Sequence, residues 1–277
     1  MTAPTNTQSN AQSNTQSNAP TNAQTNAPTT GDAALAAYVT GLGDDALVLS
    51  HRLAEWITRA PQLEEDMALA NISLDLLGQA RTLLAYAGEV AGAGRTEDDL
   101  AYLRSEREFS NVQLVELPNG DFAVTIARQL IFSAYQFELY TALLGSADET
   151  LAALAAKAVK EVAYHRDHAA QWTLRLGDGT ELSHRRMQAA LDATWPYAAE
   201  LFDPAENAAP AGVAVDPATL RPGWSAYVDQ VLAEATLAQP QPNRRSRGGR
   251  RGLHTEHLGH LLAEMQSLHR AHPGVTW

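Results

Sequence analysis

The amino-acid sequence predicts an all-α protein, a four-helix bundle with additional C-terminal helices. Alanine and leucine dominate over valine, isoleucine and threonine, a balance that favours helix over sheet. Four long stretches between residues 45 and 176 carry apolar residues three or four positions apart, the spacing of one face of a helix. The connection between the second and third stretches is the longest, as in bundles with one crossover.

Composition excludes several classes of function. The chain has 277 residues, a formal net charge of −12 and no cysteine. Without cysteine there are no disulfides, thiolate zinc sites, iron–sulfur clusters or cysteine nucleophiles, which leaves carboxylates and imidazoles as metal ligands. The negative charge argues against general nucleic-acid binding. No apolar run reaches roughly 18 residues, and the first 30 residues lack the features of a targeting signal, so we expect a cytoplasmic location.

The chain divides into two regions of different composition. We expect residues 1–31 to be a disordered low-complexity tail, because the first 30 residues are almost wholly Thr, Asn, Gln, Ser, Ala and Pro and carry no charge. We expect residues 32–277 to form a ferritin-like helical domain with a C-terminal helical extension.

The folded region is expected to begin with two helices and then a longer third. Residues 34–40 suit a short helix ended by Gly41 and Gly43, and residues 45–59 suit a second helix, which Pro61 interrupts. The helix over residues 63–86 has two apolar sides, so its spacing predicts burial around most of its circumference. One side holds Leu63, Met67, Ala70, Leu74, Leu77 and Leu84, and the other holds Leu69, Ile72, Leu76, Ala80 and Leu83.

The later elements follow from turn residues and apolar spacing. Residues 96–105 suit a short charged helix, and residues 111–121 are expected to be extended up to a Pro-Asn-Gly turn. The other long helices are predicted over residues 122–144 and 149–176, the latter capped by Asp148. After them come a helix over residues 183–202 with a Ser183 cap and a kink at Pro196, a loop over 203–215 and a helix over 216–237. An arginine-rich stretch over 240–252 and a terminal helix stopped by Pro273 and Gly274 complete the chain.

Asn71, Asp75 and Gln79 are spaced by four and therefore lie along one line of the helix over residues 63–86. Ferritin-like bundles that bind iron or manganese take Glu-x-x-His pairs from two helices, and no histidine follows Asp75 at that spacing. We therefore interpret the three residues as a buried hydrogen-bonded set.

Glu161, His165 and His168 on the fourth long helix are further candidates. We favour a structural role, with His165 bonded to a carboxylate across the core. A metal-dependent oxygenase that uses Glu161, His165, Asp75 and Glu138 is the alternative. His254, His257 and His260, with Glu256 and Glu264, favour a polar contact surface over a metal site, and the five arginines between Arg244 and Arg251 favour a flexible or partner-facing loop. No phosphate-binding glycine loop or nucleophile elbow is present.

Several strings closely resemble the family of non-catalytic C subunits of phenylacetyl-CoA epoxidase, a bacterial multicomponent monooxygenase. The resemblance covers nearly everything after Asp32. The strings are GDDALVL (43–49), EWITRAPQLEEDMALANISLDLLGQAR (55–81), LPNGDFAVTIARQL (117–130), KEVAYH (160–165) and GLHTEHLGHLLAEMQ (252–266).

The resemblance implies a scaffold without its own metal. The related A subunit resembles a di-iron oxygenase, and its six ligand positions fall on Ala46, Leu76, Gln79, Ser133, Val162 and His165 of this chain. Only His165 keeps a ligand, since Leu, Val and Ala cannot bind iron and glutamine binds it poorly. Members of the C-subunit family can retain a carboxylate where this chain has Ser133, so this chain departs from the family there.

These expectations define a function and its alternatives. The resemblance implies a structural subunit of the phenylacetyl-CoA 1,2-epoxidase in aerobic phenylacetate catabolism, with a di-iron catalytic subunit and a reductase as partners and no cofactor in this chain. We expect the segment with Arg250, Arg251, His254, Glu256 and His257 to contact a partner. Besides the metal-dependent oxygenase, a CoA-thioester binding subunit remains as an alternative.

Overall fold

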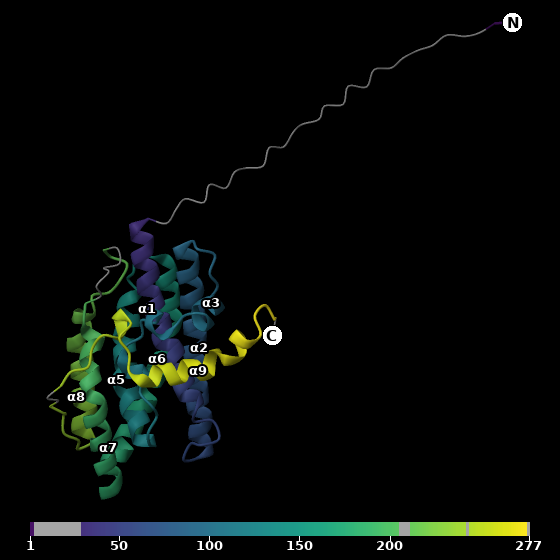
Figure 1. Ribbon diagram of the computed structural model, residues 1–277. Helices are drawn as coiled ribbons and strands as arrows, with labels where there is room; N and C mark the ends of the chain where they lie inside the picture. The colour runs from purple at the N-terminus through teal and green to yellow at the C-terminus, as the bar shows by residue number, and fades with distance from the viewer. Residues whose placement is uncertain (3–28, 205–210, 242–243, 276–277) are drawn as a thin grey trace.

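The computed structural model describes residues 1–2, 29–204, 211–241 and 244–275, and within them every regular element is helical. The all-α prediction is confirmed. Four long helices form the bundle: α1 (Thr30–Ala54), α2 (Leu63–Ala91), α5 (Phe122–Leu143) and α6 (Glu149–Gly177). α1 packs along α2 and α5 along α6 (Figure 1). The crossover from α2 to α5 contains α3 (Glu97–Tyr102), the 3-10 helix η1 (Glu106–Glu108) and α4 (Gln113–Glu116).

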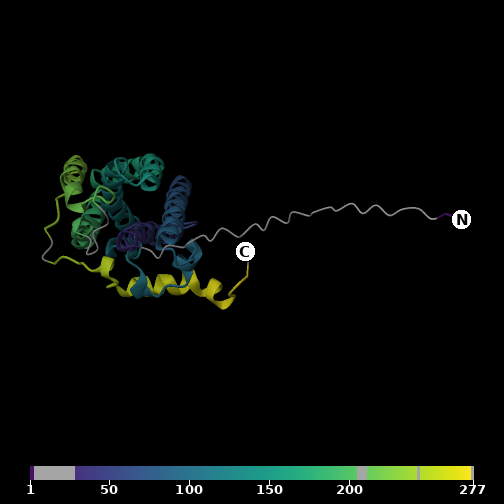
Figure 2. The same cartoon turned by 90° about the horizontal axis from the view of Figure 1, so that it is seen from above.

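The C-terminal helices cover different sides of the bundle. α7 (Glu181–Thr194) and α8 (Arg221–Glu234) pack on α5 and α6, whereas α9 (Glu256–Ala271) contacts α3 and α4 and runs across the long helices (Figure 2). The 3-10 helices η2 (Trp195–Phe202), η3 (Pro217–Leu220) and η4 (Gly249–Arg251) lie in the connections. In both views α2 forms the edge of the bundle opposite α7 and α8.

The prediction of two helices before Pro61 is wrong, because α1 continues through Gly41 and Gly43. A side chain at Gly43 would place its Cβ 2.8 Å from Leu84 Cδ2 of α2. The absence of a side chain there allows α1 and α2 to approach closely and does not end the helix. Thr29 caps α1 in a reciprocal bond with Asp32, so the helix begins at Thr30, two residues before the predicted start of the folded domain at residue 32 and four before the predicted start of the first helix. Residues 3–28 of the predicted tail lie outside the described part of the chain.

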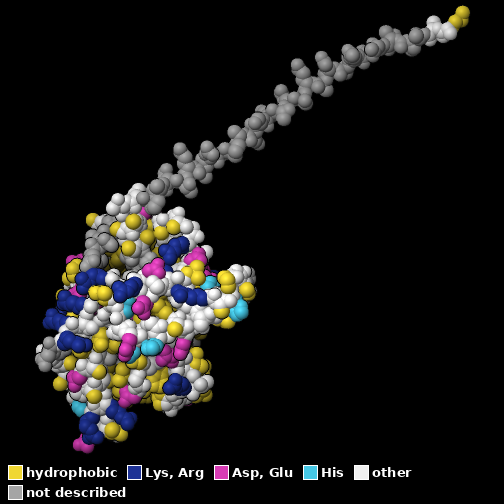
Figure 3. All heavy atoms as spheres, viewed as in Figure 1, with side chains coloured by type: hydrophobic (Ala, Val, Ile, Leu, Met, Phe, Trp, Pro, Cys, Tyr) yellow, Lys and Arg dark blue, Asp and Glu magenta, His cyan; other side chains and the backbone are white. Residues whose placement is uncertain are grey.

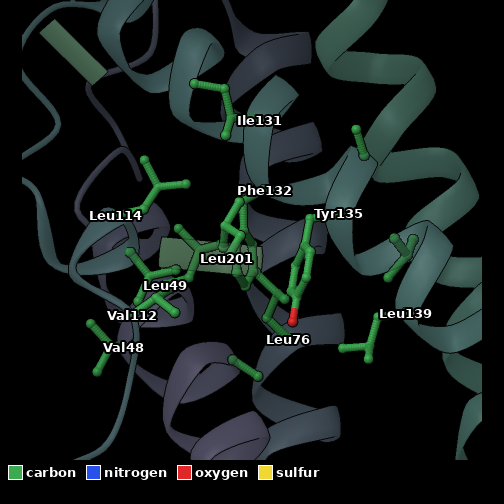
Figure 4. Packing of buried hydrophobic residues seen from close by; sticks show 14 of the residues in the cluster. Val48, Leu49, Leu76, Val112, Leu114, Ile131, Phe132, Tyr135, Leu139 and Leu201 are labelled. Carbon is green, nitrogen blue, oxygen red and sulfur yellow. The ribbon is translucent and has the colours of Figure 1, made fainter. Parts of the chain in front are cut away.

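The segment predicted to be extended over residues 111–121 is interrupted by one turn of helix, α4, while Val112 and Leu117 on either side of α4 have ψ angles of 147° and 140°. Val112 and Leu114 are fully buried. Figure 4 shows them close to Val48 and Leu49 of α1 and to Phe132 of α5. The fully buried Arg128 of α5 donates to the Leu117 carbonyl over 2.6 Å. Tertiary burial therefore decides the conformation of this segment.

Three helix boundaries also differ from the predictions. α7 begins after a Thr180 cap and gives way at Trp195 to η2, because Pro196 lacks the N–H that an α-helix requires. The helix predicted over residues 216–237 is divided into η3, which Asp216 caps as expected, and α8. α2 passes through Gly88 and ends at Gly92, whose φ of 63° is left-handed.

The prediction that the helix over residues 63–86 is buried on most sides is wrong. Leu63, Met67 and Leu74 of α2 are 71%, 60% and 63% exposed. α2 is an edge helix, so its inner side packs on α1 while its outer side has no cover among the described residues. Among the described helices only α1 is long and apolar enough, by length and composition, to cross a membrane, and 67% of that stretch is buried in the bundle.

Candidate functional site

Polar side chains connect α2 with α6. His165 Nε2 lies 3.0 Å from Asp75 Oδ2, and Gln79 Nε2 donates to Glu161 Oε2 over 3.0 Å. Nearer the start of α2, Glu65 Oε2 lies 2.8 Å from His168 Nε2. The imidazole of His165 is 1% exposed, so its bond with Asp75 satisfies a buried polar atom that would otherwise cost about 1–3 kcal/mol.

Both polar atoms of the Gln79 amide form hydrogen bonds. Its Oε1 accepts a hydrogen bond from the Tyr140 hydroxyl over 3.2 Å, while its Nε2 donates to Glu161. Burial raises the pKa of Tyr140, so the phenol remains a donor. Lys157 Nζ lies 3.4 Å from the other Glu161 oxygen. A neutral amide, which both donates and accepts, fits this position between a phenol and a carboxylate.

The six positions that the resemblance relates to a di-iron site lie inside the bundle on α1, α2, α5 and α6. Ala46, Leu76 and Val162 are completely buried. Ser133 is also buried and donates to the Gln129 carbonyl of its own helix over 2.6 Å. Nowhere in the described residues do three or more His, Asp or Glu side chains come together as metal ligands. The residues present therefore do not fit a di-iron centre.

The structure brings together only part of the predicted polar set. Asp75, Gln79, Glu161 and His165 pair across α2 and α6, but Asn71 is exposed, which corrects its assignment to the buried set. Glu138, the fourth ligand of the alternative oxygenase, faces α8, where a Cβ on Gly223 would lie 2.5 Å from Glu138 Oε2. His165 and Glu138 thus point to different neighbours.

A groove of about 500 Å³ opens beside the Gln79–Glu161 pair. Its walls come from α2 and α6, and the residues lining it include Gly78, Thr82, Thr150 and Lys157. At this groove the side chains of Gln79 and Glu161 connect α2 and α6. Sequence patterns did not reveal it, since the separation of two helices is set by tertiary packing.

Comparison with known proteins identifies the family of this bundle. A family model described as "Phenylacetic acid catabolic protein" matches residues 2–277. The chain belongs to this family. It is also similar to the C subunit of the 1,2-phenylacetyl-CoA epoxidase of Escherichia coli strain K12, with 54% identity over 246 residues that cover 88% of this chain and 99% of the relative. The resemblance found in the sequence is confirmed.

In this member of the phenylacetic acid catabolic family, Arg250 of the predicted contact segment points into the protein. Its Nη2 lies 2.5 Å from Asp45 Oδ2, and its Nη1 donates to the carbonyls of Gly41 and Ser110 over 2.7 and 2.9 Å. Burial raises the pKa of Asp45 to about 6, although the Arg250 charge opposes the rise. Arg250 thus binds Asp45 and Gly41 of α1 within the chain, and a partner contact for its side chain, which is 28% exposed, remains a prediction.

His254 is likewise bound within the chain. Its Nδ1 lies 3.0 Å from Glu116 Oε2 and its Nε2 lies 2.9 Å from the Phe109 carbonyl. Both partners are acceptors, so this arrangement favours the imidazolium form, in which both nitrogens donate. Burial lowers the pKa of His254, but the bonds with Glu116 and Phe109 outweigh burial and raise it.

The remaining residues of the contact segment have different environments. The carbonyl of His257 accepts from Arg52 Nη2 over 3.0 Å, whereas the side chains of Arg251 and Glu256 are exposed. A partner contact for these three residues remains a prediction.

Sequence reasoning missed the structural roles of two buried carboxylates, Glu200 and Asp44. Glu200, 3% exposed, accepts backbone N–H groups from Gln113, Gly248 and Gly249 over 2.8, 2.7 and 2.6 Å. Asp44 forms a buried ion pair with Arg104. Glu200 joins η2 to α4 and η4, and because these segments are far apart in the sequence, no local pattern marks it.

Proposed function

We propose that this chain is a non-catalytic scaffold subunit of a phenylacetyl-CoA 1,2-epoxidase in aerobic phenylacetate catabolism. In this role it supports a separate di-iron subunit that inserts one oxygen atom into the aromatic ring, with electrons supplied by a reductase. Family membership and the 54% identity to a protein named as the C subunit of that epoxidase support the proposal. A cytoplasmic location is part of the proposal.

One observation supports the proposal that this subunit is not catalytic. The positions related to iron ligands hold Ala46, Leu76, Gln79, Ser133, Val162 and His165, and all six are at most 4% exposed. Carboxylates buried there without a metal would be strongly destabilising, whereas the apolar side chains present contribute to the core. The bundle therefore keeps its shape without iron.

Co-expression with a tagged di-iron subunit tests the scaffold role. We expect the full-length chain to co-purify with the tagged subunit, and oxygenase activity to fall when the chain is omitted. Failure to co-purify, together with normal activity in the absence of the chain, would contradict the proposal.

Metal analysis separates this role from the alternative oxygenase. We expect the purified chain to contain almost no iron. Two iron atoms per chain that are lost in His165→Ala would instead support a metal site on this chain. Asp192→Ala on α7 serves as the control, because Asp192 lies on the exposed surface away from the bundle core.

A further inference from the structure

α2 carries a second, outward apolar face. We call it the outer seam and define it by Leu63, Met67, Ala70, Leu74 and Leu77. Successive members are four, three, four and three residues apart. The four large side chains are exposed: Leu63 71%, Met67 60%, Leu74 63% and Leu77 43%. Such a sustained apolar stripe differs from the single exposed apolar residues that are normal on protein surfaces.

The remaining described residues leave this face open. The inner side of α2 packs on α1, and its polar edge is bound to α6 through Glu65–His168 and Asp75–His165. α7 and α8 lie at the opposite edge of the bundle (Figure 2). In Figure 3 hydrophobic side chains gather at the lower right, where the first half of α2 runs. Other exposed large apolar residues, such as Leu144, Leu182 and Leu253, lie on separate elements.

The spacing of the residues in the outer seam indicates that its partner is an α-helix. Alternating steps of three and four give an average repeat of 3.5 residues, the pattern by which two α-helices pack along each other. A β-strand has a repeat of two and would not match it. From Leu63 to Leu77 the outer seam extends about 21 Å at 1.5 Å per residue, about four turns of a facing helix.

Charge at the end of the outer seam disfavours a parallel pairing with a second copy of this chain. The next position of the pattern is Arg81, whose side chain is 77% exposed and whose Nε lies 3.3 Å from Glu97 Oε1. In a symmetric parallel pair Arg81 would face Arg81 of the other copy, and the two guanidinium groups would repel each other.

We infer that the outer seam docks one helix of another member of the epoxidase complex. The inference rests on the proposed function, because it takes its partner from that complex. The partner helix carries apolar residues at alternating spacings of three and four over about four turns. It also carries a basic residue near the exposed Glu64 and an acidic or neutral residue near Arg81.

The experiment uses the full-length chain co-expressed with the other subunits of its own epoxidase, each tagged in turn. Leu74→Glu combined with Leu77→Glu places two charges in the outer seam. Leu182→Glu on α7, at a position 50% exposed, is the matched control. We expect the double variant to weaken binding at least about 30-fold while the control binds like the wild type. Both variants should keep the wild-type helical circular dichroism, because the substituted side chains lie on the surface.

The absence of cysteine allows a second, independent measurement. Leu74→Cys and Leu182→Cys each introduce one thiol into a chain that has none, so a thiol-linked photocrosslinker reports a single position. We expect a crosslink to another subunit from residue 74 and none from residue 182.

The outcomes separate the inference from the proposed function. If the wild type binds a subunit and the double variant binds it equally well, the outer seam is not the docking surface, although the proposed function stands. If residue 74 crosslinks only to a second copy of the chain, the inferred partner is wrong. If the wild type binds none of the subunits, both the proposed function and this inference fail.

Discussion

Replacing Arg250 with methionine should strongly destabilise the protein. The Asp45 side chain is 3% exposed and its ion-pair partner Arg250 is 28% exposed, and the guanidinium of Arg250 also binds two backbone carbonyls. Removing one member of a buried ion pair costs about 3–5 kcal/mol. Because the pKa of Asp45 is already about 6, this carboxyl would protonate readily once Arg250 is lost, so we expect the lower end of that range. A loss of about 3 kcal/mol lowers the Tm by roughly 6–12 °C for a chain of this size.

The assay is thermal and urea unfolding followed by circular dichroism at about pH 7. Arg247→Met is the matched control, because Arg247 Nε lies 3.3 Å from Asp203 Oδ2 in a pair whose side chains are 45% and 27% exposed. Surface pairs contribute about 0–1 kcal/mol. Asp45→Asn combined with Arg250→Met should cost less than Arg250→Met alone, since no buried charge is left. Equal losses for Arg250→Met and Arg247→Met would refute the stabilising role of the Arg250–Asp45 ion pair.

Three further predictions concern packing, pH and metal. Gly43→Ala should cost about 1–3 kcal/mol in thermal unfolding, because its Cβ would lie 2.8 Å from Leu84, whereas Gly78→Ala, with no atom within 4 Å, should stabilise α2 by about 0.5–1 kcal/mol. The raised pKa of His254 means that its stabilisation is present below the unfolded pKa of about 6.5 and is lost as the pH rises through the folded pKa. The wild-type unfolding free energy, measured in urea, should therefore fall more between about pH 6 and about pH 8 than that of His254→Asn; parallel curves would contradict this assignment. Prolonged treatment with EDTA should leave the Tm unchanged, and a decrease that added iron reverses would indicate a structural metal.

The sequence predicted α5 and α6 to within one residue at each end, because each combines a clear apolar face with a local start signal. Asp121 and Asp148 cap them by accepting the backbone N–H three residues later. Prediction failed at Gly41 and Gly43, where glycine usually ends a helix but here serves contacts with α2 and Arg250. A glycine can end a helix or allow a close contact with a neighbouring element, and the tertiary packing around it decides which of the two occurs.

The candidate site was partly predictable for a similar reason. The spacing of Asp75 and Gln79 on α2, and of Glu161 and His165 on α6, placed each pair on one line of its helix. The sequence could not decide which residues pair with which, or that Asn71 lies outside the set. Those facts depend on how α2 faces α6, because the paired residues are separated by 82 to 103 positions in the chain.

The sequence by itself determined the helical class, three of the four long helices (α2, α5 and α6) and the residue types at the positions related to iron ligands. These are local or compositional properties, set by apolar spacing and by the atoms that each side chain carries. Only the tertiary structure decided that Arg250 binds Asp45, 205 residues away, and that one apolar side of α2 is buried while the other remains exposed. An apolar stripe is identical in the sequence whether it faces a neighbouring helix or solvent, because burial depends on the elements packed around it.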